Sequence, residues 1–157
     1  MRVVYTYSNQ REGEKINAKR PRAHQRIVQR VRGIDFEMCY GESFEYSMSL
    51  KKSAHVVLEE VFSPFLHLSA LEGALVGAMV LTKFDSYTKR EVSRYLGAPE
   101  REWPFYYVTE KTLGKELERL RHEPEEVADW GRRGQEWMAK YHDPKRTLGK
   151  FLEFYGQ

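Results

Sequence analysis

Cysteine is almost absent from this chain: its 157 residues include one, Cys39. A single thiol excludes an internal disulfide framework and a zinc site built from several cysteines, and it favours a reducing compartment. No apolar run approaches the ~20 residues that a membrane-spanning helix needs. The first residues, MRVVYTYSN, contain no long apolar segment of the kind found in secretory signals. We therefore expect a cytoplasmic protein without a membrane span.

Other signals are also missing. The chain has no internal repeat, low-complexity segment or linker, and its length suits a single domain over residues 1–157. It has no Asp-x-Asp pair, and four of its histidines lack the spacing and acidic neighbours of metal ligands: His24, His55, His122 and His142. We therefore expect no metal site. The hydrophobic content of 41% and the charged content of 31% are typical of a folded globular protein rather than a disordered one.

Charge is unevenly distributed along the chain. Residues 1–32 carry nine Lys or Arg against two Glu, a balance of +7, and the net charge of +3 leaves −4 for residues 33–157. Such asymmetry indicates either an anionic partner or a solvated helix face. The sequence leaves both interpretations open.

Apolar periodicity and turn residues predict alternating strands and helices. Strands are expected over residues 3–9, 34–40, 54–58, 79–82 and 104–109. Helices are expected over 23–32, 43–53, 86–96, 110–121 and 124–141 and after Asp143, with a short helix between 58 and 79 and a loop over 10–22. This alternation predicts an α/β fold, a Rossmann-like three-layer α/β/α half-domain with a parallel sheet and C-terminal helices.

Several side chains are expected in the core. Cys39 lies within a predicted strand and is expected to be a small buried residue. Phe44 and Met48 are expected to point inward from the helix over 43–53. The aromatic residues of the helix over 124–141 follow helical spacing, which favours a core role over a stacking surface for Trp130, Trp137 and Tyr141.

The segment from Ala54 to Thr82 carries the clearest functional signal. It contains an apolar strand, a loop, a short helix that holds Glu72, and a second apolar strand, which together form a parallel βαβ unit. Ligands of such folds bind where the strands end and the helices begin. A carboxylate in an apolar helix is costly to bury unless it is paired or ligand-bound, and it can accept hydrogen bonds from two ribose hydroxyls. The alternatives for Glu72 are stabilisation by the helix dipole or an ion pair with a nearby Lys or Arg.

Three segments resemble one known family. They are SALEGALVGAMVLT (69–82), VVYTYSNQREGEK (3–15) and EEVADWGRRGQEWMAKYHDPKRTLGKFLEFY (125–155). Together they resemble the C-terminal, donor-binding half of GT-B glycosyltransferases, most closely the glycogen-synthase-like and mannosyltransferase-like retaining enzymes. The resemblance covers nearly the whole chain. It implies binding of a nucleoside diphosphate sugar without a metal or another cofactor.

The resemblance also implies roles for individual residues. Glu72 matches the second Glu of the family's Glu-x7-Glu motif, whose carboxylate binds the ribose hydroxyls. The first Glu of that motif, which helps to hold the donor sugar, falls at position 64, where this chain has Pro64. His67 stands near the place of a family glycine. Arg11 and Lys15 lie where the family has basic residues that contact the diphosphate.

Two further groups complete the expected binding site. His67 and Ser69 lie at the start of the short helix, where free backbone N–H groups attract phosphate; the alternative is that Ser69 only caps the helix. The resemblance implies that the loop after the second strand, Tyr40, Gly41 and Glu42 with Ser43, contacts the nucleobase. The alternative for Tyr40 is a place in the core.

Three functions are compatible with these observations. The leading hypothesis is a glycosyltransferase donor-binding domain, of hexosyltransferase type, that needs an acceptor-binding half from another chain or from a second copy of itself. No catalytic residue is assigned. The second hypothesis is a non-catalytic protein-interaction module derived from that domain, because position 64 lacks its Glu. The third is nucleic-acid binding through the basic N-terminal region, which is the least favoured because no nucleic-acid-binding motif is recognisable.

Overall fold

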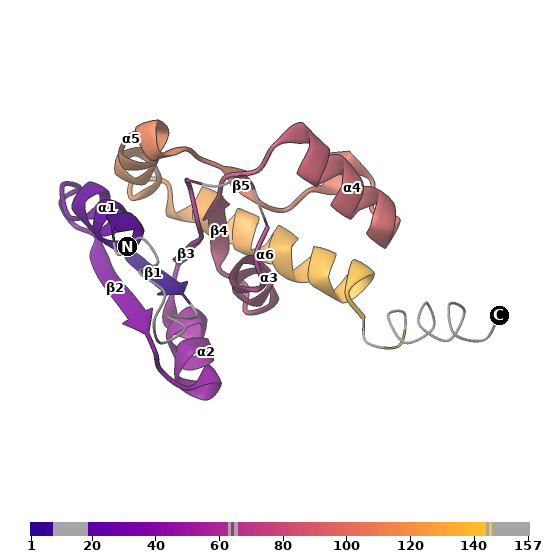
Figure 1. The fold of residues 1–157 in the computed structure, drawn as a ribbon, viewed down its shortest axis with the longest axis horizontal. Coiled ribbons are helices and arrows are strands. Elements are labelled where there is room, and N and C mark those ends of the chain that lie inside the picture. Colours follow the sequence, from indigo (N-terminus) through magenta and orange to yellow (C-terminus); the bar gives the residue numbers. More distant parts are fainter. Residues whose placement is uncertain (8–18, 63, 65, 144, 146–157) are drawn as a thin grey trace.

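The computed structural model describes residues 1–7, 19–62, 64, 66–143 and 145 (Figure 1). The described strands are β1 (Arg2–Tyr7), β2 (Asp35–Tyr40), β3 (Val56–Leu58), β4 (Met79–Thr82) and β5 (Tyr106–Tyr107). The described helices are α1 (Lys19–Val28), α2 (Phe44–Ser53), α3 (Leu68–Leu75), α4 (Ser86–Leu96), the 3₁₀ turn η1 (Glu100–Glu102), α5 (Glu110–Leu120) and α6 (Pro124–Tyr141).

The five strands form one all-parallel sheet in the order β2-β1-β3-β4-β5. The predicted α/β fold with a parallel sheet is therefore confirmed. From β1 the chain moves outward to β2 and then returns past β1 to β3, so the direction of winding reverses between β1 and β3. In open parallel sheets, such a switch point leaves a crevice outside the carboxyl ends of the strands, where ligands bind.

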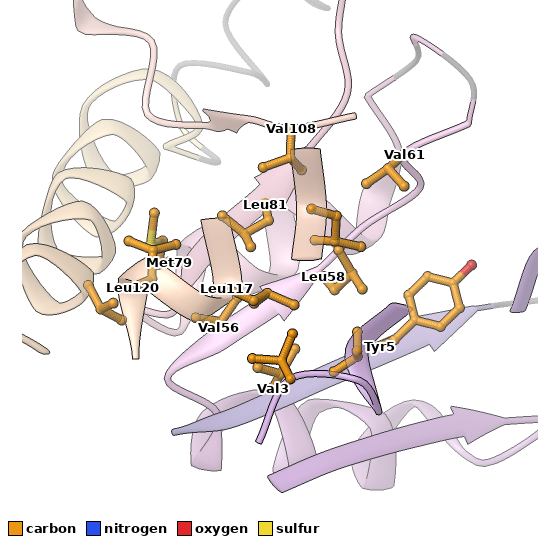
Figure 2. Packing of buried hydrophobic residues seen from close by; sticks show 14 residues of the cluster. Val3, Tyr5, Val56, Leu58, Val61, Met79, Leu81, Val108, Leu117 and Leu120 are labelled. Carbon is orange, nitrogen blue, oxygen red and sulfur yellow. The ribbon is translucent and has the colours of Figure 1, made fainter. Parts of the chain in front are cut away.

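Helices cover both faces of the sheet because consecutive strand residues point to opposite sides. Val3 belongs to a core that includes Leu117 of α5, whereas its neighbour Val4 packs in a separate cluster with Leu50 of α2. Figure 2 shows the larger core, where residues of β1, β3 and β4 pack in one cluster with Leu117 and Leu120 of α5. On the other face, α3 and α6 pack over β4.

Aromatic residues fill much of the core on the face covered by α3 and α6. Trp137 and Tyr141 are buried there, and Trp130 is partly buried against the larger core, so their predicted core role is confirmed. Cys39 is buried as expected. Phe44 contradicts its prediction: it is 62% exposed, because it occupies the first turn of α2 at the edge of the sheet.

Local sequence signals set several helix ends. Side chains at the N-caps of three helices accept a hydrogen bond from a backbone N–H of the first turn: Ser43 for α2, Asp85 for α4 and Thr109 for α5. Gly97 ends α4 in a left-handed conformation with φ of 66°. The cap at Asp85 and the stop at Gly97 explain why the bounds of α4 agree with the prediction.

Other element bounds differ from the expectation. Helix α1 begins at Lys19, so the loop predicted over residues 10–22 is wrong at its end; Pro21 is tolerated because it lies in the first turn. Strand β5 is shorter than predicted because the edge of the sheet pairs it only with Leu81 and Thr82 of β4. The helix expected after Asp143 falls almost entirely outside the described residues.

Candidate functional site

A cavity of about 440 Å³ lies at the carboxyl edge of the sheet, beside the switch point. Its wall is formed by the ends of β1 and β2, the turn over residues 41–43, one side of α2 and the first turns of α3. Five residues that the sequence analysis assigned to the ligand lie together in this wall: Gly41, Glu42, Ser43, Ser69 and Glu72. The volume is within the range of small-molecule and cofactor sites, about 300–1,000 Å³.

Glu72 forms an ion pair with Lys51 of α2, whose Nζ donates to Glu72 Oε2. The Lys51 side chain is only 1% exposed, whereas that of Glu72 is 15% exposed and opens onto the cavity. A buried ammonium needs such a partner, because its desolvation costs several kcal/mol in real proteins. The ion pair is one of the alternatives that the sequence left open for Glu72, and the cavity lies directly beside it.

Helix α3 approaches the sheet closely at Gly73, the residue after Glu72. A Cβ atom at this position would lie 2.9 Å from Cβ of Val57 in β3, which is closer than real side chains pack. Glycine therefore lets α3 lie against β3, and this approach places the Glu72 carboxylate within reach of Lys51.

Ser69 contacts the end of the first strand rather than its own helix. Its hydroxyl lies 3.0 Å from Thr6 Oγ1, and both residues line the cavity. The N-cap of α3 is His67, which makes no capping hydrogen bond with its side chain. The alternative in which Ser69 caps the helix is therefore wrong, because the helix begins one residue earlier.

The turn after β2 forms the far wall of the cavity. Gly41 has φ of 70°, a left-handed conformation that favours glycine. Ser43 accepts a hydrogen bond from the N–H of Tyr46 and thereby fixes the start of α2. Tyr40 is 39% exposed, which contradicts the alternative of a core role, and it is not part of the cavity wall.

His67 points to a buried carboxylate that the sequence analysis missed. Its Nδ1 lies 2.8 Å from Oε1 of Glu59, which is 4% exposed and lies directly after β3. The hydroxyl of Thr82, at the end of β4, donates to the other oxygen of Glu59 over 3.1 Å. The hydrogen bond to Glu59 raises the pKa of the His67 imidazole. The sequence did contain a signal, since two glutamates follow the apolar strand at the edge where ligands bind.

The remaining predicted residues do not join this wall. Arg11 and Lys15 lie outside the described residues, so their assignment to the diphosphate stays a prediction. Pro64 offers no carboxylate, and its carbonyl accepts a hydrogen bond from the Thr88 hydroxyl over 3.0 Å.

Neither a metal-binding cluster nor a membrane-spanning helix is found among the described residues. Within that part of the chain, no group of three or more His, Cys, Asp or Glu side chains is placed to hold a metal ion. No described helix has both the length and the apolar character needed to cross a membrane.

Comparison with known proteins adds no assignment. No protein family matches the sequence, and no curated protein shows significant sequence similarity to it.

Proposed function

We propose that this domain binds a nucleoside diphosphate sugar and serves as the donor-binding half of a GT-B glycosyltransferase. The observation that carries the proposal is the convergence of Gly41, Glu42, Ser43, Ser69 and Glu72 on one cavity at the carboxyl edge of the sheet. These residues come from two segments about 30 residues apart, and the sequence analysis assigned all five to the ligand. Their cavity adjoins the β1/β3 switch point, which is where ligands bind in sheets of this kind.

The Lys51–Glu72 pair suits recognition of a ribose. Lys51 occupies Oε2 of the carboxylate and holds it in place. Among the residues that the structure describes, nothing donates to Oε1, which can therefore accept a hydrogen bond from a ribose hydroxyl. A site built to bind hydroxyl groups discriminates strongly against analogues that lack them, since its polar atoms are then left unpaired.

Glycosyl transfer makes two demands on such a site. The bond between the anomeric carbon and the phosphate oxygen breaks, and the departing diphosphate must be stabilised by positive charge and oriented N–H groups. The acceptor hydroxyl forms the new bond to the anomeric carbon and loses its proton. The donor half meets the first demand, and an acceptor-binding half on another chain, or on a second copy, would meet the second.

Ligand titration tests the proposal on the unmodified protein. Isothermal titration with UDP, GDP and ADP identifies the preferred base, and the 2′,3′-dideoxy form of the preferred nucleotide then tests the ribose contact. We expect the dideoxy form to bind about 10-fold or more weakly, because one charge-assisted hydrogen bond contributes about 1.5–3 kcal/mol. The comparison leaves the protein unchanged, so it is insensitive to folding defects.

A protein variant provides a second arm. Glu72→Gln should weaken binding of the ribonucleotide and narrow its advantage over the dideoxy form. Glu118→Gln, on α5 and far from the cavity wall, is the matched control and should bind like the wild type. A folded wild-type protein that binds none of the three nucleotides at millimolar concentration would refute the proposal and favour the interaction-module hypothesis.

A further inference from the structure

Glu59, His67 and Thr82 form a hydrogen-bonded chain across the carboxyl ends of two strands and the start of α3. Glu59 is 4% exposed and receives Thr82 Oγ1 on one oxygen and His67 Nδ1 on the other. Both carboxylate oxygens are therefore occupied by donors. The His67 side chain, in contrast, is 48% exposed, so one end of this chain is buried and the other reaches solvent.

This arrangement fixes the orientation of the imidazole ring. Because Nδ1 donates to Glu59, Nε2 lies on the opposite side of the ring and faces away from the buried carboxylate. Among the described residues, Nε2 has no hydrogen-bond partner. His67 does not itself line the cavity, but as the N-cap of α3 it directly precedes Leu68 and Ser69, which do.

The surroundings of the ring favour its protonated form. The hydrogen bond to Glu59 raises the imidazole pKa most, partial burial opposes it, and the charges of Glu59 and Glu60 raise it further. Two other titratable groups lie nearby: His24 Nε2 is 3.9 Å from Glu60 Oε1, and Lys83 Nζ donates to the carbonyl of Phe62. Neither forms a hydrogen bond or ion pair with the His67 ring, and Glu59 has the largest influence on the charge of the ring.

We infer that the Glu59–His67 pair is a charge anchor that presents an imidazolium Nε2–H to a phosphate group of the nucleotide sugar. The inference rests on the proposed function and extends it, because it names a phosphate-contacting residue and the buried carboxylate that positions it. Glu59 acts only through the ring and is a positioning residue. The anchor makes nucleotide-sugar affinity depend on pH, since deprotonation of His67 removes the positive charge.

A ligand whose own charge does not change with pH is needed to measure how the affinity depends on the protonation of His67. Each of the two phosphates of a nucleotide sugar has a single ionisable oxygen, and that oxygen is strongly acidic. The charge of the ligand therefore stays constant around neutral pH. UDP-glucose, GDP-mannose and ADP-glucose are titrated first into the wild-type protein. The one that binds is then compared with its nucleoside, which has the same base and ribose but no phosphate.

The decisive variant is His67→Gln, with His122→Gln as the matched control, because His122 is an exposed histidine after α5. At about pH 6, we expect His67→Gln to weaken binding of the nucleotide sugar by about 10-fold. Its affinity for the nucleoside should match that of the wild type. The wild-type affinity for the nucleotide sugar should decline as the pH rises, and His67→Gln should abolish that decline.

The possible outcomes distinguish failure of the charge anchor from failure of the proposed nucleotide-sugar binding. If the wild-type protein binds a nucleotide sugar and His67→Gln binds it equally well at every pH, the anchor is refuted while the proposed function stands. If the folded wild-type protein binds no nucleotide sugar, the proposed function and the anchor fall together. Glu59→Gln adds a spectroscopic test: the His67 ring, followed by NMR, should titrate at lower pH. Should Glu59→Gln fail to fold, His67→Gln alone decides.

Discussion

Lys51 and Glu72, which are 21 residues apart in the sequence, form an ion pair between α2 and α3 at the wall of the cavity. The two partners differ in their surroundings. The lysine is almost completely enclosed, whereas the carboxylate opens onto the cavity. This difference predicts that removing the Glu72 carboxylate lowers the stability of the protein more than removing the Lys51 ammonium.

The Glu72→Gln variant should lose more stability than Lys51→Met. Glu72→Gln leaves an enclosed ammonium without a counter-charge, and breaking a buried pair in this way costs about 3–5 kcal/mol. Lys51→Met leaves a carboxylate that water in the cavity can solvate, so its loss should be smaller. Urea unfolding of both variants measures the difference. Equal losses, or a larger loss for Lys51→Met, would contradict the assigned burial of the two groups.

The stability of the protein should depend on the ionisation of His67. In the folded state its pKa lies above the ordinary value of 6.5, so protonation stabilises the fold. This contribution is fully present below the ordinary pKa and is lost as the pH rises through the raised, folded-state pKa. His142 acts in the opposite direction, because burial lowers its pKa.

The difference between wild type and His67→Gln isolates the first effect, since both proteins retain His142. Urea midpoints measured from about pH 5 to pH 9 cover the ordinary histidine pKa and the region above it. The stability advantage of the wild type should be largest at the acidic end and should shrink as the pH rises. An advantage that is constant or that grows with pH would show that Glu59 does not stabilise the imidazolium.

Gly131 should not tolerate a side chain. A Cβ atom there would lie 2.1 Å from the carbonyl oxygen of Gly77, so α6 would have to move away from the sheet. Gly131→Ala should therefore destabilise the protein by about 1–3 kcal/mol or more through overpacking. Gly114→Ala is the matched control, because its Cβ would meet only Ile27 at an ordinary 3.5 Å.

The control should change stability in the other direction. Gly114 lies inside α5, where alanine has the higher helix propensity, so Gly114→Ala should add about 0.5–1 kcal/mol. Thermal unfolding of the two variants gives opposite shifts if α6 packs against the Gly77 turn as described. A neutral Gly131→Ala would contradict the close packing of α6 against the Gly77 turn.

The elements that could be predicted from the sequence are those with local signals. Asp85 and Gly97 are the capping residues at the two ends of α4, and the apolar run over residues 79–82 predicts β4. Helix α1 was placed too late because Pro21 reads as a loop residue, although the first turn of a helix accepts it. Phe44 was placed in the core because its helical position suggested an inward face, whereas its location at the sheet edge exposes it.

The residues of the candidate site also differ in whether a local sequence signal could identify them. Glu72 could be singled out because a lone carboxylate in an apolar helix is unusual. Lys51 could not, because a lysine near the end of a polar helix resembles any solvated cation until α2 is packed against α3. Glu59 gave only a weak signal, since its importance depends on a hydrogen bond to His67 and on the hydroxyl of Thr82, 23 residues away.

The sequence by itself determined the alternation of strands and helices, the parallel sheet and the presence of one carboxylate in the βαβ unit. These features follow from periodicity and turn chemistry, which act over a few residues. Only the tertiary structure decided that β1 lies between β2 and β3, that Glu72 meets Lys51 and that Glu59 holds His67. Strand order and side-chain pairing depend on how distant segments pack together, and no short-range pattern encodes that choice.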